Sequence, residues 1–283
     1  MTSLERLRAS VDRIGAPLCL GIDPHPDRLP EGVGSGVAGV EAFARGLVEA
    51  TATEVAAVKI NIAFFEAFGS AGWAALERLR RDLSPNLFVI IDAKRGDIGS
   101  TAERYAAALL GHLEADAVTL SPYLGEDAIE PFLAYEDRCV YVLARTSNPS
   151  AASIQERRAG PDQLYLEVAR WVASAWADGR VGLVVGATAP DELARVRRAA
   201  PGPGFLVPGV GAQGGDLSAA ARSCHGTWAP GVVSISRGIA EASRGGDWPA
   251  AAAAAARALR GRMREAMLHS APSAAAAAPS GGS

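Results

Sequence analysis

Eight short apolar runs, rich in β-branched residues, are the feature of this sequence that most constrains its fold. They span residues 17–23, 55–61, 87–94, 117–123, 138–146, 181–187, 204–210 and 231–236. Runs such as LFVIIDAK are almost continuously hydrophobic, which is typical of parallel strands covered on both faces. Stretches between them, including 40–53, 72–83, 101–113 and 161–177, have helical spacing. Strand–helix alternation of this length predicts a closed (β/α)8 TIM barrel.

An open, doubly wound α/β sheet is the alternative architecture. It is less favoured because no G-x-G-x-x-G follows the first run, and because polar residues end many of the runs rather than gathering at one switch point. We expect one barrel domain over residues 1–269, with its last helix in the Ala-rich segment 249–258. Residues 270–283 contain only Ala, Pro, Ser and Gly, a composition that predicts a disordered tail.

Charge and cysteine content exclude several classes of protein. The 283-residue chain has a net charge of −3, which argues against a basic nucleic-acid-binding face. Cys19, Cys139 and Cys224 are odd in number and far apart, so they fit no disulfide framework or CxxC metal site and are predicted to be buried thiols. The sequence contains no run of eighteen apolar residues, the length needed to span a membrane. The charged N-terminal segment also lacks the apolar core of a signal peptide. We therefore expect a cytoplasmic protein without a nucleic-acid or membrane partner.

The third run ends in a charge pattern, D-x-K-x-x-D, formed by Asp92, Lys94 and Asp97. Side chains alternate along a strand, so Asp92 and Lys94 are predicted to face the same way. The carboxyl ends of barrel strands form the active face, and opposed charges are costly there unless they are used. The alternative is an ordinary ion pair, with Asp97 capping the helix that follows.

Polar residues end other runs as well, including Asp23, Lys59, Ser147 and Arg237. Each alone could be a turn residue, a cap or half of a surface ion pair, but their convergence on one face predicts a functional pocket. The Gly-rich loop after the seventh run, with Gln213, and the Arg237 that follows the eighth run occupy the usual phosphate position of a barrel. The substrate is therefore predicted to be phosphorylated.

Six segments, in order along the chain, resemble the orotidine 5′-phosphate decarboxylase family. They are LGIDP (20–24), VKINIAFFE (58–66), IIDAKRGDIGST (90–101), ARTSNPS (144–150), VPGVGAQGGD (207–216) and SRGI (236–239). The D-x-K-x-x-D core alone is shared with other barrel enzymes, whereas the six segments together are highly specific. The motifs KINxAFFE and TSNPS are similar to those of the longer bacterial branch of the family, called type 2.

The resemblance implies a carboxy-lyase that converts orotidine monophosphate to UMP and CO2, the last step of de novo UMP biosynthesis, with no cofactor and no metal. It implies that Lys94 donates the proton to the carbon that loses CO2, and that Asp92 lies beside the substrate carboxylate and orients Lys94. Lys59 and Asp23 are implied to bind the ribose hydroxyls, with Lys59 also joining the charged network. Ser147 matches the residue that binds the amide edge of the pyrimidine.

The resemblance also implies a homodimer with shared active sites, because Asp97 and Thr101 match residues that a partner subunit inserts. Gln213 and Arg237 match the phosphate ligands. Ser236 stands where many relatives have Gly before the Arg, and a contact through its backbone amide would survive that change. Residues 150–160 and 209–215 are the expected lid segments.

Two other functions stay open from the residues. One is a metal-dependent sugar-phosphate decarboxylase or aldol-type synthase on the same barrel, which would need a carboxylate where this chain has Lys59. The other is a non-enzymatic barrel that binds a phosphorylated metabolite and needs no cluster of four charged residues.

Overall fold

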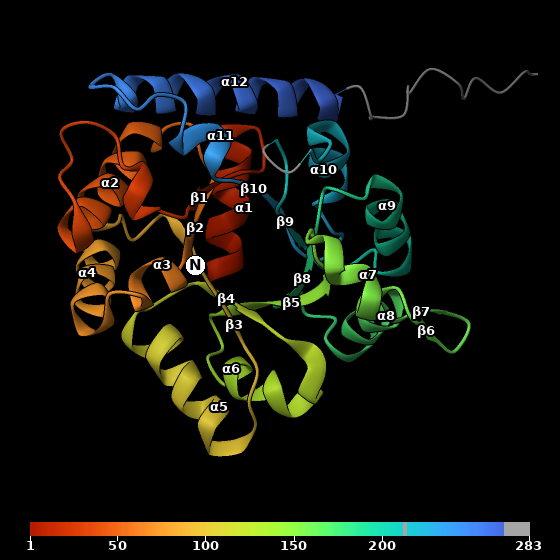
Figure 1. The fold of residues 1–283 in the computed structure, drawn as a ribbon. Helices are drawn as coiled ribbons and strands as arrows, with labels where there is room; N and C mark the ends of the chain where they lie inside the picture. Colours follow the sequence, from red (N-terminus) through yellow and green to blue (C-terminus); the bar gives the residue numbers. More distant parts are fainter. Residues whose placement is uncertain (212–213, 269–283) are drawn as a thin grey trace, which may run out of the picture.

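The computed structural model describes residues 1–211 and 214–268 of the chain. Eight parallel strands close into a barrel in the order β1-β10-β9-β8-β5-β4-β3-β2 (Figure 1). They are β1 (Leu18–Ile22), β2 (Ala57–Asn61), β3 (Phe88–Arg95), β4 (Ala117–Leu120), β5 (Cys139–Arg145), β8 (Val181–Val185), β9 (Phe205–Val207) and β10 (Val232–Ile235). The TIM-barrel prediction is confirmed, and the open doubly wound sheet is wrong.

Helices surround the barrel in Figure 1 and cover the outer faces of its strands. They are α1 (Ser3–Ile14), α2 (Gly36–Thr51), α3 (Ala63–Glu66), α4 (Gly69–Asp82), α5 (Gly99–Ala106), α6 (Glu130–Leu133), α7 (Ala152–Gln155), α8 (Leu164–Ala175), α9 (Pro190–Ala199), α10 (Leu217–Ser223), α11 (Arg237–Ala240) and α12 (Trp248–Leu268). A π-helical segment, Ala107–His112, continues α5. Helix α8 begins later than its helical spacing predicted, because residues 158–163 form a small antiparallel hairpin, β6 (Arg158–Ala159) and β7 (Asp162–Gln163).

Several barrel strands are shorter than the apolar runs that predicted them. The run 204–210 contains only β9, and the run 117–123 contains only β4. In each case a proline, Pro208 or Pro122, follows within two residues of the strand end. Proline has no N–H to donate to the next strand, so the ladder stops there.

Helix α1 lies against the amino end of the barrel. A capping box formed by Thr2 and Glu5 begins it, and its apolar side is buried in the core. Ser3 and Arg6 both bind the buried carboxylate of Asp116, which directly precedes β4. With this end of the barrel covered, the cavity described below opens at the opposite, carboxyl end of the strands.

Helix α12 is longer than the expected last helix and packs along α2 and α10 (Figure 1). Its first residue, Trp248, packs edge-on against Phe43 of α2, with 5.1 Å between the ring centroids. Buried Met263 extends the contact well beyond the Ala-rich stretch, which explains the greater length. The expected tail, residues 270–283, lies outside the described residues. No helix among the described residues is long and apolar enough to cross a membrane.

Candidate active site

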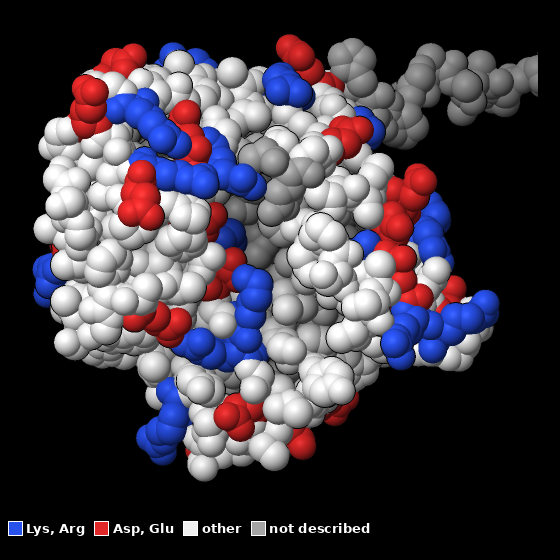
Figure 2. Space-filling model, viewed as in Figure 1, with Lys and Arg blue, Asp and Glu red and all other residues white. Residues whose placement is uncertain are grey.

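A cavity of about 480 Å³ opens at the carboxyl ends of the barrel strands. Figure 2 shows the hollow in the middle of this face, with acidic and basic side chains at its wall. Of the predicted site residues, the cavity is lined by Asp23, Lys59, Asp92, Lys94, Ser147, Ser236 and Arg237. The structure therefore brings these strand ends together around one cavity, as the sequence predicted.

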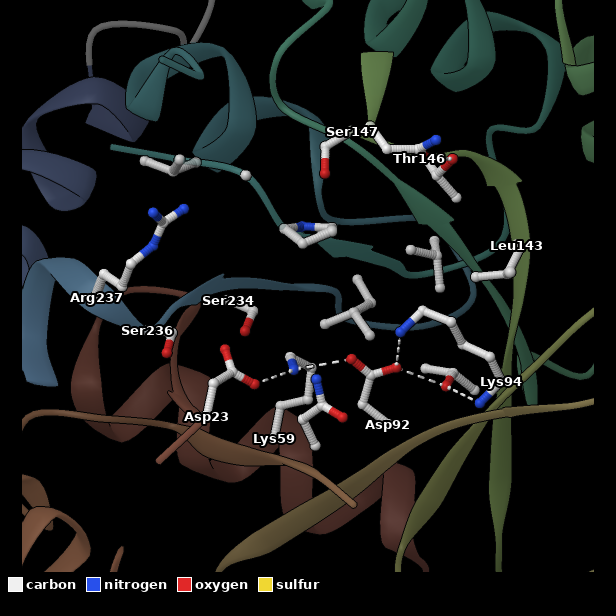
Figure 3. A pocket seen from close by; sticks show the side chains of 18 of the residues that line it. Asp23, Lys59, Asp92, Lys94, Leu143, Thr146, Ser147, Ser234, Ser236 and Arg237 are labelled. Carbon is white, nitrogen blue, oxygen red and sulfur yellow. Dashed lines mark hydrogen bonds and ion pairs between the residues drawn. The ribbon is translucent and has the colours of Figure 1, made fainter. Parts of the chain in front are cut away.

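Four charged side chains form a row of alternating sign along one wall of the cavity (Figure 3). The ammonium of Lys59 lies 3.0 Å from Oδ2 of Asp92 and 3.6 Å from Oδ1 of Asp23. The other oxygen of Asp92, Oδ1, accepts a 2.6 Å hydrogen bond from Nζ of Lys94. We call Asp23, Lys59, Asp92 and Lys94 the charged quartet; its formal charges cancel.

The quartet holds its inner members in their charged forms. Burial alone would lower the pKa of Lys59, but the carboxylates of Asp92 and Asp23 outweigh it, so the pKa lies above its ordinary value. Burial alone would raise the pKa of Asp92, but the ammonium groups of Lys59 and Lys94 hold it well below the ordinary value. Asp92 is therefore an anion, and Lys59 a cation, at neutral pH.

Lys94 of the quartet lies on an irregular stretch of β3. From Ile91 to Arg95 the strand advances four residues, while its neighbour β4 advances two, from Val118 to Leu120. Lys94 has φ 47°, in the left-handed region that costs about 1–2 kcal/mol for a residue with a Cβ. Asp92 and Lys94 both line the cavity, as the alternation of side chains predicted, and Lys94 does so from a bulged, left-handed backbone that the sequence did not predict.

Arg237 lies at the far side of the cavity from Lys94 (Figure 3). It is exposed, and within residues 1–211 and 214–268 its guanidinium has no hydrogen-bond or ion-pair partner. The loop beside it places Gly209 at φ 94° and Gly211 at φ 78°, conformations that residues with a Cβ rarely adopt. The predicted phosphate ligand Gln213 lies outside the described residues.

The segment 150–160 is hydrogen-bonded to residues at the carboxyl end of β5. Gln155 accepts a 2.8 Å bond from the amide of Thr146 and donates one of 2.8 Å to its hydroxyl, and Arg145 donates a 2.6 Å bond to Glu156. Thr146, Ser147 and Gln155 all line the cavity. The expected lid is therefore in contact with the barrel in this structure.

A sequence model described as the "Orotidine 5'-phosphate decarboxylase / HUMPS family" matches residues 16–255. The chain belongs to this family. Among its relatives is the orotidine 5′-phosphate decarboxylase of Roseiflexus castenholzii, 48% identical over 271 residues that cover 94% of this chain and 99% of the relative. The family resemblance drawn from the six segments is confirmed.

Solved structures of the same family agree with the barrel. The chain is similar to Leishmania donovani OMP decarboxylase, with a TM-score of 0.83 and 38% identity over 95% of this chain and 100% of that one. It is also similar to Leishmania donovani UMP synthase, with a TM-score of 0.84 and 40% identity, where it spans 56% of that longer chain.

Lys59 does not favour the metal-dependent alternative. Its ammonium occupies the position beside Asp92 where that alternative needs a carboxylate, and a cation there repels a metal ion. Among residues 1–211 and 214–268, no group of three or more His, Cys, Asp and Glu side chains is arranged to hold one.

Asp97 and Thr101 do not line the cavity of their own chain. Within the described residues, the carboxylate of Asp97 accepts a hydrogen bond only from the adjacent amide of Ile98, and Ile98, not Asp97, is the N-cap of α5. The helix-cap alternative for Asp97 is therefore wrong. Both residues lie on a surface next to Ile98, whose side chain is 52% exposed.

The sequence-based site prediction left out six polar residues that line the cavity: Asn61, Thr119, Thr146, Asn148, Gln155 and Ser234. Thr119 and Ser234 are single hydroxyls in the otherwise apolar strands β4 and β10, and that contrast is the signal that could have found them. Gln155 lies on a short helix in a loop, where no periodic pattern distinguishes it.

The three cysteines are all buried and unpaired, as predicted. Burial raises the pKa of Cys19, Cys139 and Cys224 to about 12 in each case, so the thiols stay protonated at neutral pH. None of them can act as a thiolate nucleophile in this site.

Proposed function

We propose that this chain catalyses the decarboxylation of orotidine 5′-phosphate to UMP and CO2, the last step of de novo pyrimidine biosynthesis. The observation that carries the proposal is the charged quartet, an unbroken row at the carboxyl end of the barrel in a chain whose relatives are named orotidine 5′-phosphate decarboxylases. The reaction needs no cofactor, because the site stabilises charge with its own fixed groups.

The exposure of the quartet separates the roles of its two lysines. The side chain of Lys94 is 49% exposed and reaches the cavity, whereas that of Lys59 is 7% exposed and lies between two carboxylates. Lys94 therefore supplies positive charge as the pyrimidine carbon gains carbanion character, and then donates the proton that replaces CO2. Lys59 holds Asp92 and Asp23 in place.

Asp92 uses one carboxylate oxygen for each lysine, so it is already anchored when substrate enters. It aims Lys94 at the reacting carbon and presents negative charge to the substrate carboxylate, a contact that is relieved when CO2 leaves. This arrangement is built before the reaction, so little reorganisation is needed in the transition state.

The remaining cavity residues bind parts of the substrate that do not react. Arg237 binds the phosphate, Asp23 and Lys59 bind the ribose hydroxyls, and Ser147 binds the amide edge of the pyrimidine. Supporting this division, Lys94 and Arg237 lie at opposite sides of the cavity (Figure 3). Binding energy at the phosphate then holds the ring against the quartet and contributes to the rate.

The functional unit proposed here is a cytoplasmic homodimer, in which Asp97 and Thr101 enter the partner's site. Supporting this, Asp97 does not cap a helix, and the amide of Ser121 bonds to the carbonyl of Arg95, two residues before Asp97; nearby in sequence, Tyr123 is 85% exposed and Leu124 is also exposed. Large exposed hydrophobic side chains of this kind are typical of a surface covered by another subunit.

The test follows orotidine 5′-phosphate by its ultraviolet absorbance, with and without prior EDTA treatment. We expect turnover that survives the chelator, and loss of nearly all turnover in Lys94→Ala and Lys94→Arg, since arginine is bulkier and retains its proton. Activity lost to EDTA and restored by Mg²⁺ would favour the metal-dependent synthase class. Binding of UMP without any turnover by the wild type would favour a non-enzymatic binding barrel.

A further inference from the structure

The hydroxyl of Thr119 lies beneath the charged quartet, at the point where β3 is irregular. Thr119 is 1% exposed in β4, and its Oγ1 donates a 2.9 Å hydrogen bond to Oδ1 of Asp92. Oγ1 of Thr119 also accepts hydrogen bonds of 3.0 Å from the backbone amides of Ala93 and Lys94. A threonine hydroxyl has one hydrogen to donate and two lone pairs to accept with, so all its capacity is used here.

These three bonds replace the regular strand pairing that the bulge removes. Between Ile91 and Arg95 of β3 no residue pairs regularly with β4, and Thr119 is the β4 residue opposite that gap. Its hydroxyl holds two of the amides that the gap leaves without a ladder partner. It thus fixes the backbone of Lys94 in the left-handed conformation that a residue with a Cβ otherwise avoids.

The hydroxyl of Thr119 also bonds to Asp92, one of the two acidic members of the quartet. Oδ1 of Asp92 accepts both from Thr119 and, at 2.6 Å, from Nζ of Lys94. One hydroxyl therefore sets the rotation of the carboxylate and the backbone of the lysine that the carboxylate binds. We infer that Thr119 is a positioning residue for the decarboxylation proposed above: its hydroxyl aims the Lys94 ammonium at the reacting carbon by fixing Asp92 and the β3 bulge together.

This inference rests on the proposed function, so wild-type turnover of orotidine 5′-phosphate is measured first. The decisive variants are Thr119→Val, which keeps the shape and removes the hydroxyl, and Thr119→Ser, which keeps the hydroxyl and removes a methyl group. A misplacement of about 1 Å at a reacting group can cost roughly 10²-fold in rate. We expect Thr119→Val to lower kcat by about 10²-fold with KM within about threefold, and Thr119→Ser to stay within about fivefold in kcat.

A matched control separates positioning from the general cost of altering a buried threonine. Thr51 in α2 is also fully buried, with its hydroxyl donating a 2.8 Å bond to the carbonyl of Leu47, and it is not among the residues that line the cavity. Thr51→Val should therefore lose stability in urea denaturation but leave kcat within about twofold of the wild type.

Several results would overturn the inference while leaving the proposed function intact. One is a Thr119→Val kcat within threefold of an active wild type, and another is a Thr119→Ser variant as slow as Thr119→Val. If Thr119→Val does not fold, Thr119→Cys decides: its thiol is a weaker hydrogen-bond partner, so its kcat should fall clearly below that of Thr119→Ser. Equal kcat values for Thr119→Cys and Thr119→Ser would refute the role of the hydroxyl. An inactive wild type would instead refute the proposed function.

Discussion

Replacing Lys59 with Met removes the cation at the centre of the quartet while keeping a side chain of similar length. Lys59 lies 3.0 Å from Asp92 and 3.6 Å from Asp23, and its side chain is 7% exposed. At an effective dielectric constant of about 20, each of these attractions is on the order of 5 kcal/mol. Desolvation of the charges opposes them by several kcal/mol per ion, so the gross attraction is not the net effect.

The expected loss in the free energy of unfolding follows from what the substitution leaves behind. Removing one partner of a buried ion pair costs about 3–5 kcal/mol, because the other charge stays buried without compensation. In Lys59→Met the carboxylate of Asp92 keeps Lys94 as a partner at 2.6 Å. We therefore expect the lower end of the range, about 3 kcal/mol.

Urea denaturation followed by far-ultraviolet circular dichroism measures this loss, at one fixed protein concentration. The double variant Lys59→Met/Asp92→Asn removes both buried charges and should be more stable than Lys59→Met by about 1 kcal/mol or more. The control is Arg28→Met, which breaks an exposed pair with Glu241 and should cost less than about 1 kcal/mol.

The pH dependence gives an independent check. In the wild type the lowered pKa of Asp92 contributes stability that is present above its ordinary value of 3.8 and is lost as the pH falls through the lowered value. The raised pKa of Lys59 contributes stability that is present below 10.5 and is lost as the pH rises through the raised value. The difference between wild type and Lys59→Met should thus be constant from about pH 5 to 10 and shrink below 3.8. A Lys59→Met protein as stable as the wild type at pH 7 would refute this account of the quartet.

Two further predictions concern the substrate side of the site. Lys94→Ala and Asp97→Ala homodimers should each be inactive, but an equal mixture that exchanges subunits should recover about a quarter of wild-type activity, because a mixed dimer has one intact shared site; mixed dimers with no recovery would rule the shared site out. Arg237→Ala should lower kcat/KM for orotidine 5′-phosphate by roughly 10–100-fold, as expected for a lost hydrogen bond to a charged group, and should equal the wild type on orotidine, which lacks the phosphate. A similar loss on both substrates would place Arg237 elsewhere than at the phosphate.

The barrel and most of its site residues could be predicted because they depend on local patterns. The apolar runs identified the strands, and the carboxyl ends of parallel barrel strands meet on one face, so a polar residue at the end of a run must approach the others. That rule predicts Asp23, Lys59, Asp92 and Arg237 around one cavity, which the structure shows. It needs only the position of each residue along its own strand.

The tertiary structure decided those features that depend on how one strand is aligned with its neighbour. The gap in β3 pairing, the left-handed Lys94 and the hydroxyl of Thr119 that bridges them arise from a register shift, and a register shift leaves no periodic mark in either strand. The sequence by itself determined which strands form and which charges end them, because hydrophobic burial and chain periodicity act within a segment. Only the closed barrel determined which hydroxyl aims the lysine, because that hydrogen bond joins residues 25 positions apart, whose alignment exists only in the folded sheet.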